Sequence, residues 1–386
     1  MSPPSFAPRF LWMFCIGYAA SLILMPNGTL LPYLSMFMIL YGLHLGVKST
    51  AGKSYSGIIT FIALLLPFAA INSAISPGNI DTSLKWLLWF GALLGMYLMA
   101  LRCGEKIDEA LCKNTAPAFF IIWAVLAFKG NSLAESKNEE MRLLHLSAFY
   151  ANLLIASALF HPQKFYRVLF VIIGVMGALT SGSRAAFLFL PIIFLPGIIY
   201  YYKVRFSSIA IISIVIAGLL TVATNETLLS ITFGRKGADV TNLDSLELAE
   251  KSMMGRAELR AQGIKFIKQK PWGHGYGATY SIIDDRGVNK GSNLHNGYLN
   301  VATQMGVHIF ILYMGILLWA LFKLMTNQRV SRRSRFFTLS ILGCGCLRAV
   351  SESFSFFDLG HPAAFFSIFL ISLFIVRSNH PRYQSL

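Results

Sequence analysis

Four side chains between residues 184 and 295 have the types that an enzyme acting on an anionic substrate requires. His295 is a side chain that can accept a proton near neutral pH. Arg184, Arg256 and Arg260 carry delocalised positive charge and can grip a phosphate through paired hydrogen bonds. We therefore predict that His295 is a catalytic base, and that Arg184, Arg256 and Arg260 bind an anionic group of the substrate.

Further candidates lie close to these four in the sequence or near the C-terminus. Arg286 and Arg348 are predicted as secondary contacts to the anion, and Asn296 directly follows the candidate base. Glu352 and Asp358 could orient His295 or a sugar, and the sequence does not decide between these roles.

Each candidate also has an ordinary explanation. Arg184 could contact lipid headgroups, and Arg256 and Arg260 could be solvated charges on a helix. His295 could cap the helix that follows it. His274 stands among glycines, which favours a role in a turn over catalysis.

Neither a metal nor a nucleotide site is indicated. Asp284 and Asp285 are adjacent carboxylates without a clustered histidine, a pattern more typical of a solvated loop. Gly273, Gly275 and Gly277 predict a tight turn, because a glycine-rich phosphate loop must follow a strand and open a helix. We expect no cofactor and no metal.

The composition predicts that these residues are held by a membrane protein. Hydrophobic residues make up 55% of the 386 residues and charged residues only 13%, where a soluble domain has about a quarter. The mean hydropathy is +0.60. The apolar runs are long enough to span a bilayer as helices and lack the alternation of barrel strands. The predicted fold is therefore an all-α integral membrane protein.

The apolar runs predict about twelve spans and one long polar loop. The spans are about 10–25, 29–47, 56–76, 84–101, 116–129, 143–160, 165–181, 185–202, 206–224, 297–322, 336–350 and 361–377. The span 297–322 is expected to be continuous, and 116–129 and 336–350 are short. The predicted divisions are 1–224 with nine spans, a loop at 225–296 carrying the site, and 297–386 with three spans and a tail.

The distribution of basic residues predicts the orientation of these spans. With both termini in the cytoplasm, every inside segment is basic, as the positive-inside rule requires. These basic residues are Arg9, Lys48, Lys53, Arg102, Lys106, Lys113, Lys164, Arg167, Lys203, Arg205, Lys323, Arg329, Arg332, Arg333, Arg335, Arg377 and Arg382. The net charge of +16 is thus explained by topology and anionic lipid headgroups, without nucleic acid. The long loop then lies outside.

The long loop itself has the pattern of a folded unit. A helix is expected to begin near Ser245, and a second is expected from Arg256 to Gln269, ended by Pro271. Leu259, Gly263, Phe266 and Ile267 share one face of this second helix.

Four short motifs, in a fixed order, resemble those of a known enzyme family. They are Ser-Gly-Ser-Arg-Ala-Ala at 181–186, Gly-Arg-Ala-Glu-Leu at 255–259, Pro-Trp-Gly-His-Gly at 271–275 and Leu-His-Asn at 294–296, followed by Gly306. Their order and spacing resemble the O-antigen ligase (Wzy-C) superfamily of bacterial polysaccharide enzymes. The resemblance covers mainly residues 165–325.

The resemblance implies glycosyl transfer on the periplasmic face of the bacterial inner membrane, in lipopolysaccharide biosynthesis. The implied donor is a glycan on undecaprenyl pyrophosphate, and the implied acceptor is a sugar hydroxyl of lipid A–core. In such a transfer the resemblance implies that His295 takes the proton of the incoming hydroxyl and that Arg184, Arg256 and Arg260 bind the departing pyrophosphate. It implies no ATP and no metal, and membrane lipids are the other expected partners. The oligomeric state stays open.

Two other functional classes remain. One is a polysaccharide polymerase or protein O-glycosylating transferase of the same superfamily, which differs in its acceptor. The other is a multi-span transporter. Transporters usually have repeat symmetry and charge at the bilayer midplane, whereas the charges of interest here lie at one interface in an asymmetric loop.

Overall fold

All regular secondary structure in the described part of the chain is helical. The computed structural model describes residues 107–132, 137–181, 189–202, 259–275, 296–326, 330–351 and 362–379, together with Trp12, Ile16, Ala19, Met96, Ala100, Ser183, Ala186 and Leu294. No strand occurs within these residues, which agrees with the predicted all-α class.

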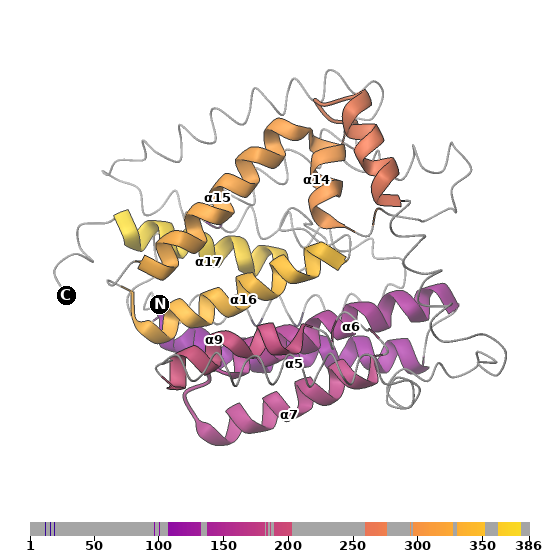
Figure 1. Ribbon diagram of the computed structural model, residues 1–386. Coiled ribbons are helices and arrows are strands. Elements are labelled where there is room, and N and C mark those ends of the chain that lie inside the picture. The colour runs from indigo at the N-terminus through magenta and orange to yellow at the C-terminus, as the bar shows by residue number, and fades with distance from the viewer. Residues whose placement is uncertain are drawn as a thin grey trace.

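The longer described stretches contain eight labelled helices and one further helix (Figure 1). They are α5 (Ile107–Ser132), α6 (Lys137–Ala158), α7 (Lys164–Thr180), α9 (Leu190–Tyr202), α14 (Gly297–Met305), α15 (Val307–Thr326), α16 (Arg332–Ser351) and α17 (Pro362–Asn379). The further helix covers residues 259–269 and is drawn in orange-red beside α14. Figure 1 shows α5, α6, α7, α9 and α16 running roughly along one another.

The positions of six predicted spans agree with observed helices. The short predicted spans 116–129 and 336–350 become α5 with 26 residues and α16 with 20 residues, both long enough to cross a bilayer. Within the described residues, Ile107–Gly130 and Val307–Thr326 are both long and apolar enough to count as candidate spans. The predicted spans 10–25, 29–47, 56–76, 84–101 and 206–224 lie outside the described stretches, so the total of twelve stays a prediction.

The expectation of one continuous helix over 297–322 was wrong. The helix breaks at Gly306, which has a φ of 93° and a ψ of 160° and separates α14 from α15. This backbone conformation is essentially restricted to glycine. Hydropathy could not reveal the break, because apolar residues continue on both sides of it.

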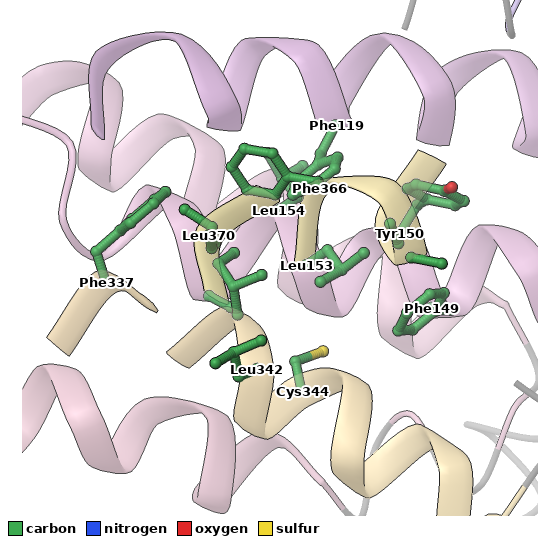
Figure 2. Packing of buried hydrophobic residues seen from close by; sticks show 14 of the residues in the cluster. Phe119, Phe149, Tyr150, Leu153, Leu154, Phe337, Leu342, Cys344, Phe366 and Leu370 are labelled. Carbon is green, nitrogen blue, oxygen red and sulfur yellow. The ribbon is translucent and has the colours of Figure 1, made fainter. Parts of the chain in front are cut away.

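The core lies where α5, α6, α16 and α17 meet (Figure 2). The ring of Phe119 on α5 packs edge-on against Phe366 on α17, with 5.6 Å between the ring centroids. Tyr150 on α6 lies 5.9 Å from Phe119, and Phe337 on α16 lies 6.4 Å from Phe366. These rings join two distant parts of the chain into one bundle.

Small residues allow α7 to approach its neighbours closely. A Cβ atom at Gly174 would lie 2.6 Å from Ile155 on α6, and one at Gly177 would lie 2.5 Å from Trp123 on α5. Small residues at helix contacts are typical of packing within membranes.

The opposite face of α7 and one face of α15 expose large apolar side chains. On α7 these include Phe165, Ile172 and Met176, and on α15 they include Ile311 and Phe322. A water-soluble monomer rarely exposes apolar patches on this scale. The exposed faces agree with the predicted membrane protein.

One end of the bundle collects arginines and tyrosines. Arg167 on α7 stacks 4.7 Å above the Tyr201 ring of α9, and Arg332 on α16 stacks 5.7 Å from the Tyr200 ring. Arg335 donates from Nη1 to a carbonyl in the last turn of α15 at 3.4 Å. The charge pattern had assigned these arginines to one side of the membrane, and the structure brings them to one end.

Candidate functional site

The C-terminal end of α16 joins two of the candidate residues. The carbonyl oxygen of Val350 accepts hydrogen bonds from Arg260 Nη2 at 3.2 Å and from Asn296 Nδ2 at 3.3 Å. The last carbonyls of a helix have no partner within the helix and carry partial negative charge. An arginine and an amide donor are therefore suited to this helix end, which lies opposite the end with Arg332 and Arg335.

Asn296 is also the N-cap of α14. Its backbone is extended, with φ −155° and ψ 109°, and its side-chain Oδ1 accepts a hydrogen bond from the Leu299 N–H at 3.0 Å. Sequence reasoning gave a capping role to His295 as its ordinary alternative; the residue that caps α14 is the next one. His295 itself lies outside the described residues.

The residue before His295 is held by the helix over 259–269. Leu294 is fully buried and packs against Phe266, with Leu299 at its edge. Gly263 lies on the same helix face, and a Cβ atom there would come within 2.9 Å of Leu294. The prediction that Gly263 and Phe266 share a packed face is thus confirmed.

Residues 271–275, which follow the helix over 259–269, form backbone hydrogen bonds with the ends of α14 and α15 at the break between them. The N–H of His274 donates to the Thr303 carbonyl at 2.9 Å, and the N–H of Gly275 donates to the Gln304 carbonyl at 2.8 Å. In return, Val307 N–H donates to the Pro271 carbonyl at 2.9 Å. The break leaves backbone groups at the helix ends without intrahelical partners, and the loop supplies partners.

Two of the glycines in this contact are required by their geometry. Gly273 has a φ of 96° and Gly275 a φ of 101°, so the predicted tight turn is confirmed for residues 271–275. The His274 ring nitrogen Nε2 lies 3.0 Å from the Phe266 carbonyl oxygen. This contact agrees with the predicted structural role of His274.

Arg348 is buried between α16 and α6. It is 5% exposed, donates from Nη2 to the His145 carbonyl at 2.8 Å, and lies over the Phe149 ring at 5.9 Å. A buried charge requires such compensating contacts. These contacts join α16 to α6 one turn or less from Val350, so Arg348 supports the end of the bundle that carries the site. Its predicted contact with the anion stays a prediction.

The backbone on both sides of Arg184 is tied to the bundle. Ser181 Oγ donates to the Ala178 carbonyl on α7 at 2.8 Å and accepts the Ser183 N–H at 3.3 Å. Asn152 on α6 donates from Nδ2 to the Ala186 carbonyl at 3.3 Å. Sequence reasoning missed Asn152, although a buried amide within the apolar span 143–160 was a usable signal.

The other candidate side chains lie outside the described residues. They are Arg184, Arg256, Arg286, His295, Glu352 and Asp358. Arg260 and Asn296 are brought together on one acceptor, whereas Arg348 contacts α6. Within the described stretches, no group of three or more His, Cys, Asp and Glu side chains is placed to hold a metal ion.

Comparison with known proteins finds one family that is similar to the central stretch of the chain. The family described as O-Antigen ligase (Wzy_C) matches residues 169–314, from α7 into α15. The resemblance inferred from the four motifs is therefore confirmed for this stretch. No curated protein and no solved structure matches the chain.

The central stretch is therefore similar to membrane enzymes of the glycosyltransferase type, and two apolar helices among the described residues are long enough to span a membrane. The matched stretch contains Arg184, Arg256, Arg260, Arg286, His295 and Asn296, whereas Arg348 follows it.

Proposed function

We propose that the protein is an O-antigen ligase of the bacterial inner membrane. It moves a polysaccharide from undecaprenyl pyrophosphate to a sugar hydroxyl of lipid A–core on the periplasmic face. The observation that carries this proposal is the family match over residues 169–314, because it includes the candidate base and the candidate phosphate-binding arginines. The arrangement of Arg260 and Asn296 on one helix end supports it.

The proposed chemistry uses this chain's own residues. His295 takes the proton from the acceptor hydroxyl, whose oxygen forms a new bond to the anomeric carbon of the donor glycan. The bond between that carbon and the pyrophosphate oxygen breaks, and the lipid pyrophosphate leaves with the bonding electrons. Arg184, Arg256 and Arg260 stabilise the negative charge that develops on it. The pyrophosphate is already a good leaving group, so we propose transfer without a metal or cofactor.

Arg260 is suited to a role in anion binding. Only one of its terminal nitrogens is committed to a described acceptor, the Val350 carbonyl, and within the described residues no carboxylate pairs with it. A guanidinium held in place by a neutral acceptor keeps its full positive charge for a phosphate.

The proposed architecture follows the divisions inferred from the sequence. Residues 1–224 form nine spans, 225–296 form the periplasmic loop with the site, and 297–386 form three spans and the tail. Both termini are cytoplasmic. The gathering of Arg167, Arg332 and Arg335 at the end opposite Arg260 supports this orientation.

Reporter fusions test this orientation. A reporter enzyme that is active only outside the cytoplasm is expected to work when fused near Thr241 or Asn289. It is expected to fail near Arg333 or after Leu386, because the basic segments stay inside. Reporter activity after Leu386 would contradict the even number of spans and the periplasmic position of His295.

The lipopolysaccharide pattern of a deletion strain tests the function. A strain without this protein is expected to retain lipid A–core but to carry no attached polymer, and the intact gene is expected to restore the polymer ladder. A core with a single repeat attached would instead identify a polysaccharide polymerase, and unchanged lipopolysaccharide with unglycosylated proteins would identify a protein O-glycosylating transferase. Gel electrophoresis of lipopolysaccharide, together with a glycan stain of the cell's proteins, distinguishes the three.

A further inference from the structure

The oxygen and the nitrogen of the Asn296 side-chain amide form hydrogen bonds with two different helices. Its Oδ1 accepts the Leu299 N–H at 3.0 Å and so caps α14, while its Nδ2 donates to the Val350 carbonyl at 3.3 Å. An asparagine amide offers both an acceptor and donors, and here the two serve two different helices. Asn296 therefore links the start of α14 to the end of α16.

This link restricts the backbone beside the candidate base. Asn296 has the extended conformation of an N-cap, with φ −155° and ψ 109°. The two hydrogen bonds of its side chain hold Asn296 between the start of α14 and the end of α16. On the other side of His295, Leu294 is fully buried against Phe266. Both neighbours of the candidate base are thus fixed, one by α16 and one by the helix over 259–269.

The acceptor of Asn296 is shared with a candidate phosphate ligand. Arg260 Nη2 donates to the same Val350 carbonyl at 3.2 Å, and a carbonyl oxygen can accept two hydrogen bonds. Arg260 and Asn296, the residue next to the candidate base, lie on different segments of the chain. Both donate a hydrogen bond to the Val350 carbonyl oxygen, so this one atom holds the two segments together. A transfer reaction needs the base and the phosphate-binding groups at a fixed separation.

We propose that Asn296 is a positioning residue that sets the orientation of His295 relative to Arg260, through the Val350 carbonyl at the end of α16. This role is distinct from helix capping alone and from direct contact with substrate. The proposal rests on the proposed function, in which His295 is the base.

Two substitutions separate positioning from capping. Asn296→Ser keeps a side-chain oxygen that caps α14 but is too short to reach Val350. Asn296→Ala removes both contacts. Gln163→Ala is the matched control, because Gln163 is the N-cap of α7 and makes no side-chain capping hydrogen bond.

Three quantities are measured on the full-length protein in detergent. They are the thermal unfolding midpoint, kcat and KM for transfer from the lipid-linked donor to lipid A–core, and the rate at which diethyl pyrocarbonate modifies His295, followed on its peptide by mass spectrometry. Asn296→Ser is expected to retain the native midpoint and KM, to lose up to about 10²-fold in kcat, and to change the modification rate of His295. Asn296→Ala should show the same kinetic loss with a lower midpoint, and Gln163→Ala should match the native protein in all three.

Two results would overturn the positioning role. Native kcat and native His295 modification in Asn296→Ser would reduce Asn296 to a helix cap. A raised KM at unchanged kcat would make Asn296 a direct substrate contact. If the native protein transfers no glycan to lipid A–core, the proposed function fails; the modification rate of His295 in Asn296→Ser still decides whether Asn296 positions that side chain.

Discussion

Replacement of His295 by alanine is expected to abolish transfer while the protein still inserts into the membrane and still binds the donor. Loss of a general base typically lowers the rate by about 10²–10⁴-fold. Donor binding should persist because the proposed phosphate ligands are arginines. Donor binding and turnover are measured separately on the purified variant. Near-normal transfer by His295→Ala would refute the proposed mechanism even though the family match stands.

The arginine variants provide the comparison for this result. Arg184→Ala and Arg256→Ala are expected to weaken donor binding as well as turnover. Arg184→Lys should rescue only in part, because an ammonium group cannot reproduce the paired hydrogen bonds of a guanidinium. Arg335→Ala, at the opposite end of α16, is the matched control and should leave donor binding unchanged. Normal binding and turnover in both Arg184→Ala and Arg256→Ala would contradict the phosphate-binding role.

The break between α14 and α15 predicts a second large effect. In Gly306→Ala a Cβ atom would lie 2.5 Å from the Trp272 carbonyl oxygen, and the φ of 93° is strained for any other residue. The conformational strain alone costs about 1–3 kcal/mol, and the clash with backbone adds to it. Gly273→Ala meets the Gln304 carbonyl oxygen at 2.6 Å. Both variants are expected to lower the yield of folded protein and its thermal midpoint, because residues 271–275 would separate from the break.

Two helical glycines serve as controls for this experiment. A Cβ atom at Gly315 on α15 or at Gly343 on α16 would meet no atom within 4 Å. Gly315→Ala and Gly343→Ala are therefore expected to retain stability or to gain about 0.5–1 kcal/mol, since alanine favours a helix over glycine. If Gly306→Ala were as stable as Gly315→Ala, the contact between 271–275 and the break would not stabilise the fold.

Local patterns in the sequence determined much of the helical architecture. Long apolar runs predict helices wherever the backbone must satisfy its own hydrogen bonds, and α6, α7, α16 and α17 follow from them. The helix over 259–269 and the turn after Pro271 were also predictable, since apolar spacing, proline and glycine act within a few residues. The candidate chemistry of His295 and the arginines likewise followed from residue types and motif order.

Only the tertiary structure decided how distant segments meet. Arg260 and Asn296 reach Val350 across sequence separations of 90 and 54 residues, and Arg348 reaches His145 across 203. The local sequence does not predict these hydrogen bonds. Their acceptors are backbone carbonyl groups, which every residue type has, so the acceptor residue cannot be recognised from its type. The break at Gly306 could not be predicted from the sequence either. A glycine is needed there because residues 271–275 pack against it. That contact forms only when both segments have folded.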